Sequence, residues 1–198
     1  METRLMHDTK EKSMLILAHE EKYAAALARH VIDKPKLSIW MILIPIFFVF
    51  YFFQLNKCMD GRRMFAEHYL VSKKRALDEA VEVVDTGRNP DCQALAKLSD
   101  MPDIVKEKQA DVFTVLVEHY IVLLNAQGED FPSLVRNAYG SLTNYMLMFN
   151  RLIQTEREVN KTLTPHLDTS HQKIKEVISR MEVSAEKLWR DSAESIFM

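Results

Sequence analysis

The hydrophobic residues of this chain are distributed unevenly, and the longest apolar run lies close to its N-terminus. No charged residue occurs between Leu37 and Asn56, and 16 of the 19 residues from 37 to 55 are hydrophobic. A helix of this length covers about 28 Å, close to the ~30 Å hydrocarbon thickness of a bilayer. The pattern predicts a transmembrane helix over residues 37–56. Basic residues flank the run on both sides, namely Lys34, Lys36, Lys57, Arg62 and Arg63.

The flanks of this predicted span also indicate how it would be oriented. Residues 1–36 precede the run and no small-residue cleavage site follows it, so we expect an uncleaved anchor rather than a signal peptide. Six basic residues lie within 20 positions on the C-terminal side and four on the N-terminal side, which favours a cytoplasmic C-terminal domain. The sequence therefore predicts a single-pass protein of the cell membrane that contacts lipid through residues 37–55.

The segment before the run, residues 1–36, has the spacing of an amphipathic helix from about Thr9 to Asp33. Pro35 separates this helix from the run, because the residue before a proline disfavours the helical conformation. Basic and acidic residues are mixed along the segment, which argues against a strongly cationic helix lying on a membrane surface. We expect it to pack on another helix, in this chain or in a partner.

Helical spacing continues after the run, through Gly61 to about Val84. A strong stop signal follows, with Gly87 at the expected end of the helix and Pro90 shortly after it. A short helix is predicted over residues 91–98, and a longer one over 102–126. The apolar part of the helix over 102–126 is too short and too polar to be a second span. We therefore expect this helix to be the most buried one of the domain.

The C-terminal third has apolar residues seven positions apart, typical of helices that pack along their length. Together with a short connector near Pro165, this spacing predicts an antiparallel αα-hairpin or coiled coil over about residues 132–196, or else one long rod kinked at Pro165. No stretch requires a β-strand, so the predicted fold class is all-α. Three segments are expected: an N-terminal helix (1–36), a transmembrane helix (37–56) and a soluble helical domain (57–198).

Composition and motifs narrow the function by exclusion. The chain has 26 basic and 28 acidic residues, a net charge of −2, which does not favour nucleic acid as a partner. Its two cysteines, Cys58 and Cys92, are too few for a disulfide scaffold or a four-thiolate zinc site. Phosphate-binding, nucleotide-binding, serine-hydrolase and zinc-protease motifs are all missing. We therefore predict no catalytic residues, no cofactor and no enzymatic activity.

Two groups of polar residues remain as weak candidates for a site. His166, Asp168 and His171 could meet at the start of the last helix and hold a divalent ion, although a polar helix N-terminus explains them equally well, so we assign no metal. Glu118 and His119 interrupt the most apolar helix. If Glu118 is buried, its carboxyl group would have a raised pKa. The alternative is that both residues lie on a solvent-exposed stripe of the helix.

Two short surface motifs complete the set of candidates. The basic stretch Lys73-Lys74-Arg75 could meet anionic headgroups or form a solvated face. Asn160-Lys161-Thr162 matches the glycosylation pattern, which matters only in a secretory lumen.

These observations favour a non-enzymatic scaffold, adaptor or accessory subunit that is anchored in a membrane. Its helical domain would bind a protein partner or form a homo-oligomer. Two alternatives stay open. One is a signal-transducing or regulatory subunit, and the other is a helical bundle that binds a small ligand or metal around Glu118 and His119.

Overall fold

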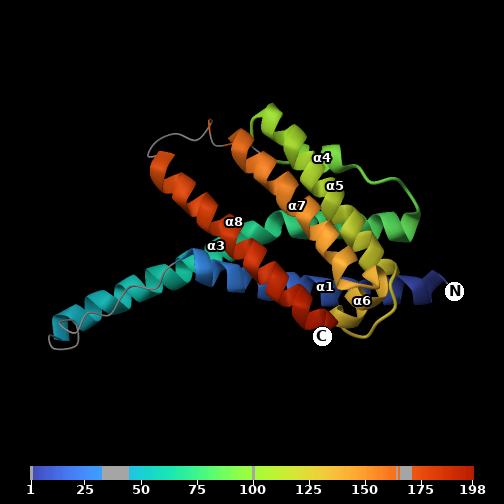
Figure 1. Ribbon diagram of the computed structural model, residues 1–198, viewed down its shortest axis with the longest axis horizontal. Helices are drawn as coiled ribbons and strands as arrows, with labels where there is room; N and C mark the ends of the chain where they lie inside the picture. Colours follow the sequence, from blue (N-terminus) through green and yellow to red (C-terminus); the bar gives the residue numbers. More distant parts are fainter. Residues whose placement is uncertain (1, 33–44, 100, 164, 166–170) are drawn as a thin grey trace.

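The computed structural model describes residues 2–32, 45–99, 101–163, 165 and 171–198. Over these ranges the chain forms helices and connecting turns without a strand, which confirms the predicted all-α fold class. The N-terminal helix α1 covers Glu2–Val31 and runs antiparallel to α3, with which it packs (Figure 1). The helices that follow α1 are α3 (Pro45–Thr86), α4 (Cys92–Lys97), α5 (Asp103–Asn125), α6 (Phe131–Tyr139), α7 (Leu142–Leu163) and α8 (His171–Phe197).

Helix α1 belongs to the same hydrophobic core as the C-terminal helices. It packs extensively against α3 and α8, and over smaller contacts against α5 and α6. Its residues Ile16 and Leu27 are fully buried, in one cluster with Leu116 of α5 and Trp189 of α8. Of the two partners that the sequence left open for this helix, the structure therefore shows a contact within the chain.

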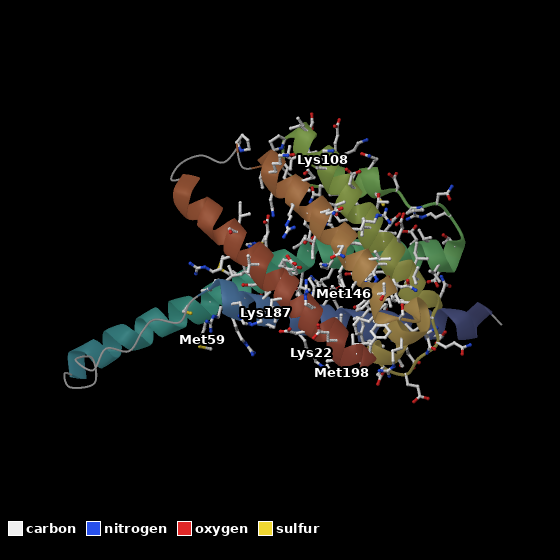
Figure 2. The ribbon with its side chains drawn as sticks, in the orientation of Figure 1. Lys22, Met59, Lys108, Met146, Lys187 and Met198 are labelled. Carbon is white, nitrogen blue, oxygen red and sulfur yellow. The ribbon has the colours of Figure 1, made fainter. Side chains whose placement is uncertain are left out.

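Helix α3 has two parts with different surroundings. As predicted, it continues through Gly61, and it ends at Thr86, where Gly87 adopts a φ of 71°. Its N-terminal part projects beyond the other helices, whereas its C-terminal part lies in the bundle (Figure 1). Met59, on the projecting part, is 60% exposed and lies away from the bundle centre in Figure 2. We call the projecting part, residues 45–61, the arm.

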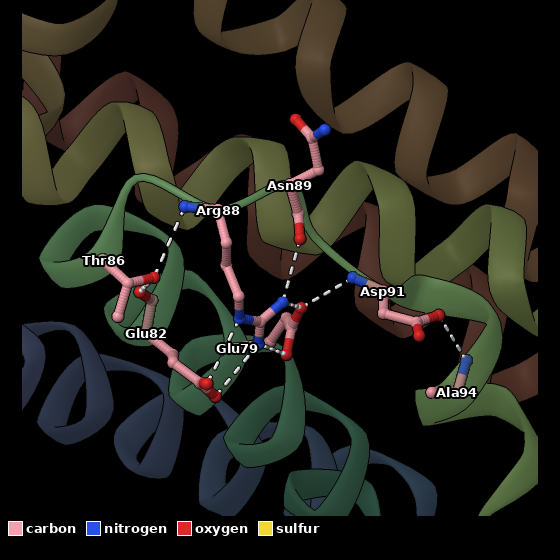
Figure 3. A network of polar contacts seen from close by, with 7 residues as sticks. All are labelled: Glu79, Glu82, Thr86, Arg88, Asn89, Asp91 and Ala94. Atoms are coloured by element: carbon pink, nitrogen blue, oxygen red, sulfur yellow. Dashed lines mark hydrogen bonds and ion pairs between the residues drawn. The ribbon is translucent and has the colours of Figure 1, made fainter.

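A polar network holds the turn between α3 and α4 (Figure 3). The Arg88 guanidinium donates two hydrogen bonds of 2.7 Å to the two carboxylate oxygens of Glu79, and the Asp91 backbone N–H donates a third bond to Glu79. Hydrogen bonding by Arg88 lowers the pKa of the buried Glu79 carboxyl. The side chain of Asp91 then accepts a hydrogen bond from the backbone of Ala94 and caps α4.

Helix α5 is covered on several sides, as its apolar sequence predicted. Val112, Phe113, Val115, Leu116 and Val117 are all buried, although they point in different directions around the helix. The helix packs against α3, α4 and α7. Burial on more than one face follows from a sequence without a wide polar stripe.

The C-terminal hairpin differs from the prediction in one respect. Helices α7 and α8 do pack against each other, but the helix expected to start near Val135 is broken in two. Gly140 has a φ of 69° and ends α6, and α7 begins two residues later. The left-handed conformation at a glycine is a common way to end a helix, and the seven-residue spacing across Gly140 hid it. Helix α6 starts with a capping box between Asp130 and Ser133.

The described residues do not support the predicted transmembrane helix. None of the helices that they form is both long enough and apolar enough to cross a bilayer. Of the predicted span 37–56, residues 37–44 lie outside the described part of the chain.

Candidate functional site

Glu118 and His119 do not form a joint site. Glu118 is exposed and makes an ion pair with Arg151 on α7, so it lies on a solvent-exposed stripe of α5. His119 is buried, and its Nδ1 shares a hydrogen bond of 2.6 Å with the hydroxyl of Tyr139. Burial, with smaller effects of Lys73 and His19, lowers the pKa of His119 to about 3, so the ring is neutral at physiological pH.

The candidate metal ligands cannot be placed as a group. His166 and Asp168 lie outside the described residues, as does the whole connector to α8 except residue 165. Within the described part of the chain, no three His, Cys, Asp or Glu side chains gather closely enough to hold a metal ion.

The basic stretch at 73–75 is not a uniform surface patch. Lys73 is only 2% exposed, and its Nζ lies 3.9 Å from an oxygen of Glu20, which is equally buried. Lys74 instead makes a surface ion pair of 3.5 Å with Glu21. One lysine therefore points into the bundle and the next points out, because adjacent residues on a helix are about 100° apart.

Aromatic side chains surround this buried ion pair. The Nζ of Lys73 lies 5.1 Å from the ring centre of Trp189 and 5.7 Å from that of Tyr69. The hydroxyl of Tyr120 donates a hydrogen bond of 2.9 Å to Glu20. A buried charge pair with so few hydrogen bonds is costly to desolvate, so its aromatic neighbours contribute to holding the lysine.

A pocket of about 160 Å³ opens beside the ion pair, between α3, α5, α7 and α8. Its inner walls are mostly apolar, with Phe113 from α5 and Ile153 from α7. Asn160, the first residue of the Asn-Lys-Thr motif, is one of its lining residues and donates a hydrogen bond to Glu182. The other residues that line the pocket are Tyr69, Ser72, Gln109, Val112, Glu156, Arg157, Val159, Met181, Glu182 and Ala185.

Glu156 is the unusual group of this pocket. No described residue makes a hydrogen bond or an ion pair to its carboxyl group. Burial raises the pKa of Glu156, the nearby positive charge of Lys73 lowers it, and Glu20 and Glu182 raise it further. The hydroxyl of Tyr69 is also buried; it lies near the Tyr23 hydroxyl but makes no hydrogen bond of normal geometry. Unpaired polar groups at a pocket, here the half-buried Glu156 carboxyl and the buried Tyr69 hydroxyl, often mark binding sites.

Sequence patterns alone did not reveal this pocket. Tyr69, Phe113, Glu156 and Ala185 come from four helices, and each sits in an ordinary amphipathic pattern. Glu156 even occupies an apolar position of the seven-residue spacing, in line with Phe149 and Leu163. A charged residue at such a position is the one local signal that could have pointed to the site.

The base of the arm is a second feature with a distinct chemistry. The Arg62 guanidinium donates hydrogen bonds to the backbone carbonyl of Ile32, and Arg180 of α8 donates one to Val31. Arg29 and Arg63 are exposed close by and line a shallow groove together with Arg62. The end of the bundle from which the arm projects is therefore rich in arginine.

No protein-family model matches this chain, and neither a curated protein nor a solved structure shows significant similarity to it. A functional proposal therefore depends on the physical features of this chain alone.

Proposed function

We propose that this protein is a non-enzymatic, membrane-attached scaffold or accessory subunit whose apolar run enters and leaves the bilayer on the same side. Residues 37–55 would dip into the membrane as a hairpin instead of crossing it. The helical bundle, including α1, would then lie wholly on one side, where it is free to contact other proteins.

The packing of α1 is the observation that carries this proposal. The Glu20 carboxylate of α1 accepts a hydrogen bond from Tyr120 of α5, and the Tyr23 hydroxyl donates one of 3.0 Å to the Ala185 carbonyl of α8. In a single-pass protein, α1 and the C-terminal helices would be separated by the bilayer. A ~30 Å hydrocarbon layer between them is incompatible with contacts of this length.

The geometry at the base of the arm fits a hairpin. Ile32 and Gly61 flank the intervening segment, and a Cβ atom added at Gly61 would lie 3.7 Å from the Ile32 side chain. From Gly61 back to Pro45 the helix rises about 24 Å, whereas the 13 residue steps from Ile32 to Pro45 can reach up to about 43 Å. The chain between Ile32 and Pro45 is thus long enough to return.

The depth of such a hairpin matches one leaflet. From Leu55 to Pro45 a helix rises about 15 Å, roughly half of the ~30 Å hydrocarbon thickness. The arginines at the base of the arm would then lie at the level of the headgroups. Each basic side chain near an anionic surface contributes about 1 kcal/mol to binding.

Labelling from one side of the membrane tests this topology. Cys92 is buried and unsuitable as a reporter, so both native cysteines are replaced by serine. Single cysteines are then introduced at the exposed positions Lys10 of α1 and Glu194 of α8. We expect an impermeant maleimide to label both sites, or neither, in intact cells, and both after permeabilisation.

Two results of the labelling experiment would refute the hairpin. Labelling of Lys10→Cys and Glu194→Cys from opposite sides would restore the single-pass topology. Recovery of the protein outside the membrane fraction would exclude attachment altogether.

The scaffold part of the proposal needs a separate test. Extraction of the protein in mild detergent, followed by crosslinking, should yield a defined complex with another protein or with a second copy. Recovery of the monomer alone would contradict it.

A regulatory subunit is a second candidate, favoured by the continuity of α3. This 42-residue helix runs without a break from the arm into the bundle, so a movement of the arm would be transmitted to the core. Insertion of flexible residues after Gly61 would abolish a regulatory activity but leave membrane attachment intact. A scaffold would tolerate the insertion.

A further inference from the structure

We propose that the pocket between α3, α5, α7 and α8 binds a small organic cation with an apolar body, and that Glu156 is its counter-ion. This inference is independent of how the protein is attached to a membrane, since the pocket lies within the bundle.

The size and walls of the pocket define the body of the ligand. A volume of about 160 Å³ accommodates one six-membered ring, because a dry cavity of about 150 Å³ binds benzene. Val112, Phe113 and Ile153 supply apolar surface, and all three are buried. A ring or a short branched chain would fill this space, whereas a nucleotide or a sugar phosphate is too large and too polar.

The charges around the pocket define the sign of the ligand. Glu182 already accepts a hydrogen bond of 2.9 Å from Asn160 and lies 3.8 Å from Arg157, and Arg157 also pairs with Glu186. Inside the bundle, Glu20 is paired with Lys73. Among the described residues, Glu156 is the pocket carboxyl without such a partner, so the site has an uncompensated negative charge when Glu156 is ionised.

The neighbours of Glu156 suit an ammonium group. Tyr69 lines the same pocket, and its hydroxyl, which is buried in the structure, has no well-formed hydrogen bond and can accept one from an N–H of a ligand that reaches it. Tyr69 and Phe113 both line the pocket, and aromatic rings attract cations. A bound cation would also restore the charged form of Glu156, because an opposite charge lowers the pKa of a carboxyl group.

Calorimetric titration of the protein with three probes of similar size tests the proposal. Benzylamine is the cation, benzyl alcohol the neutral analogue and benzoate the anion. We expect benzylamine to bind at least about tenfold more tightly than either of the others, which corresponds to about 1.4 kcal/mol.

Variants locate the binding. Glu156→Gln should weaken benzylamine binding by about tenfold or more and leave benzyl alcohol unaffected. Glu158→Gln is the matched control, since Glu158 is exposed on the same helix, and it should bind like the wild type. Tyr69→Phe removes a hydroxyl that makes no well-formed hydrogen bond, so it should fold normally and weaken benzylamine binding by a smaller factor.

Several outcomes would overturn the proposal. Equal affinity for benzylamine and benzyl alcohol would show an apolar cavity without charge selection. Tighter binding of benzoate would assign the site to an anion. The proposal also fails if none of the probes binds, or if Glu156→Gln and Tyr69→Phe both bind benzylamine as the wild type does.

Discussion

The two parts of α3 form one continuous helix but differ in their position relative to the bundle. In the bundle, α3 buries one stripe, with Leu70, Lys73, Leu77 and Ala80 inside and Val71 exposed. The arm, residues 45–61, projects beyond the bundle (Figure 1). Its sequence is apolar on all sides up to Leu55, and six of the seven residues from 47 to 53 are aromatic.

This difference shows what helical periodicity does and does not convey. A one-sided apolar stripe is satisfied by neighbouring helices of the same chain. An all-round apolar helix needs an apolar environment on every side, and the arm projects beyond the bundle (Figure 1). Substitutions in the two parts should therefore change different properties. Those in the bundle part should change the stability of the fold, and those in the arm should change membrane attachment.

The largest effect on stability is expected in the bundle part, from Lys73→Met. Removal of the lysine leaves the buried Glu20 carboxylate without its cation, which should lower the free energy of unfolding by about 3–5 kcal/mol. Urea denaturation in detergent measures the change, and flotation with vesicles should be unaffected. Lys74→Met is the control, because its pair with Glu21 is at the surface and contributes about 1 kcal/mol or less. Equal stability of the two variants would contradict this account.

In the arm, Phe50→Asp is expected to reduce membrane attachment without changing the stability of the bundle. A carboxylate in the hydrocarbon region of the bilayer is unfavourable by up to about 2.5–3.5 kcal/mol, so flotation with anionic vesicles should decrease strongly. The melting temperature of the bundle in detergent should not change. Val71→Asp, at an exposed position of the bundle part, should alter neither property. A lower melting temperature for Phe50→Asp would mean that the arm packs on the bundle.

Lowering the pH should reduce the stability of the bundle, and the arm should not contribute to this pH dependence. The pKa of His119 is about 3 in the fold, below its ordinary value of 6.5. The unfolded chain therefore binds a proton first, so stability is greatest above pH 6.5 and falls as the pH is lowered towards 3. At about 1.4 kcal/mol per pKa unit, this group alone should remove about 2 kcal/mol between pH 7.5 and 5.

The variant His119→Gln isolates this contribution. Its loss of stability between pH 7.5 and 5 should be smaller than that of the wild type. The comparison is needed because the half-buried His19, whose pKa is also lowered, acts in the same direction, and Glu156, with its raised pKa, acts in the opposite one. Identical pH profiles would exclude His119 as a source of the acid sensitivity.

The smallest effect is expected from Gly140→Ala, at the break between α6 and α7. No atom would clash with the added Cβ, so only the left-handed backbone conformation opposes the change. The variant should be less stable by about 1 kcal/mol. An increase in stability would show that the two helices can merge into the single one that the seven-residue spacing predicted.

Local signals predicted most of the helix boundaries. Gly87 and Pro90 stop α3 as predicted, because the chemistry of a helix end depends on a few neighbouring residues. Burial of polar groups was not predictable in the same way. Glu20 and Tyr120 are a hundred positions apart, and nothing near either residue indicates that they meet.

By itself, the sequence determined the helical class, the main breaks between helices and the position of the long apolar run, since periodicity and composition are properties of short segments. Only the tertiary structure decided that α1 packs with α5 and α8, because those contacts join residues a hundred or more positions apart. The same packing places both flanks of the apolar run at one end of the bundle. It also leaves Glu156 without a partner among the described residues, although its sequence position is that of an ordinary core residue.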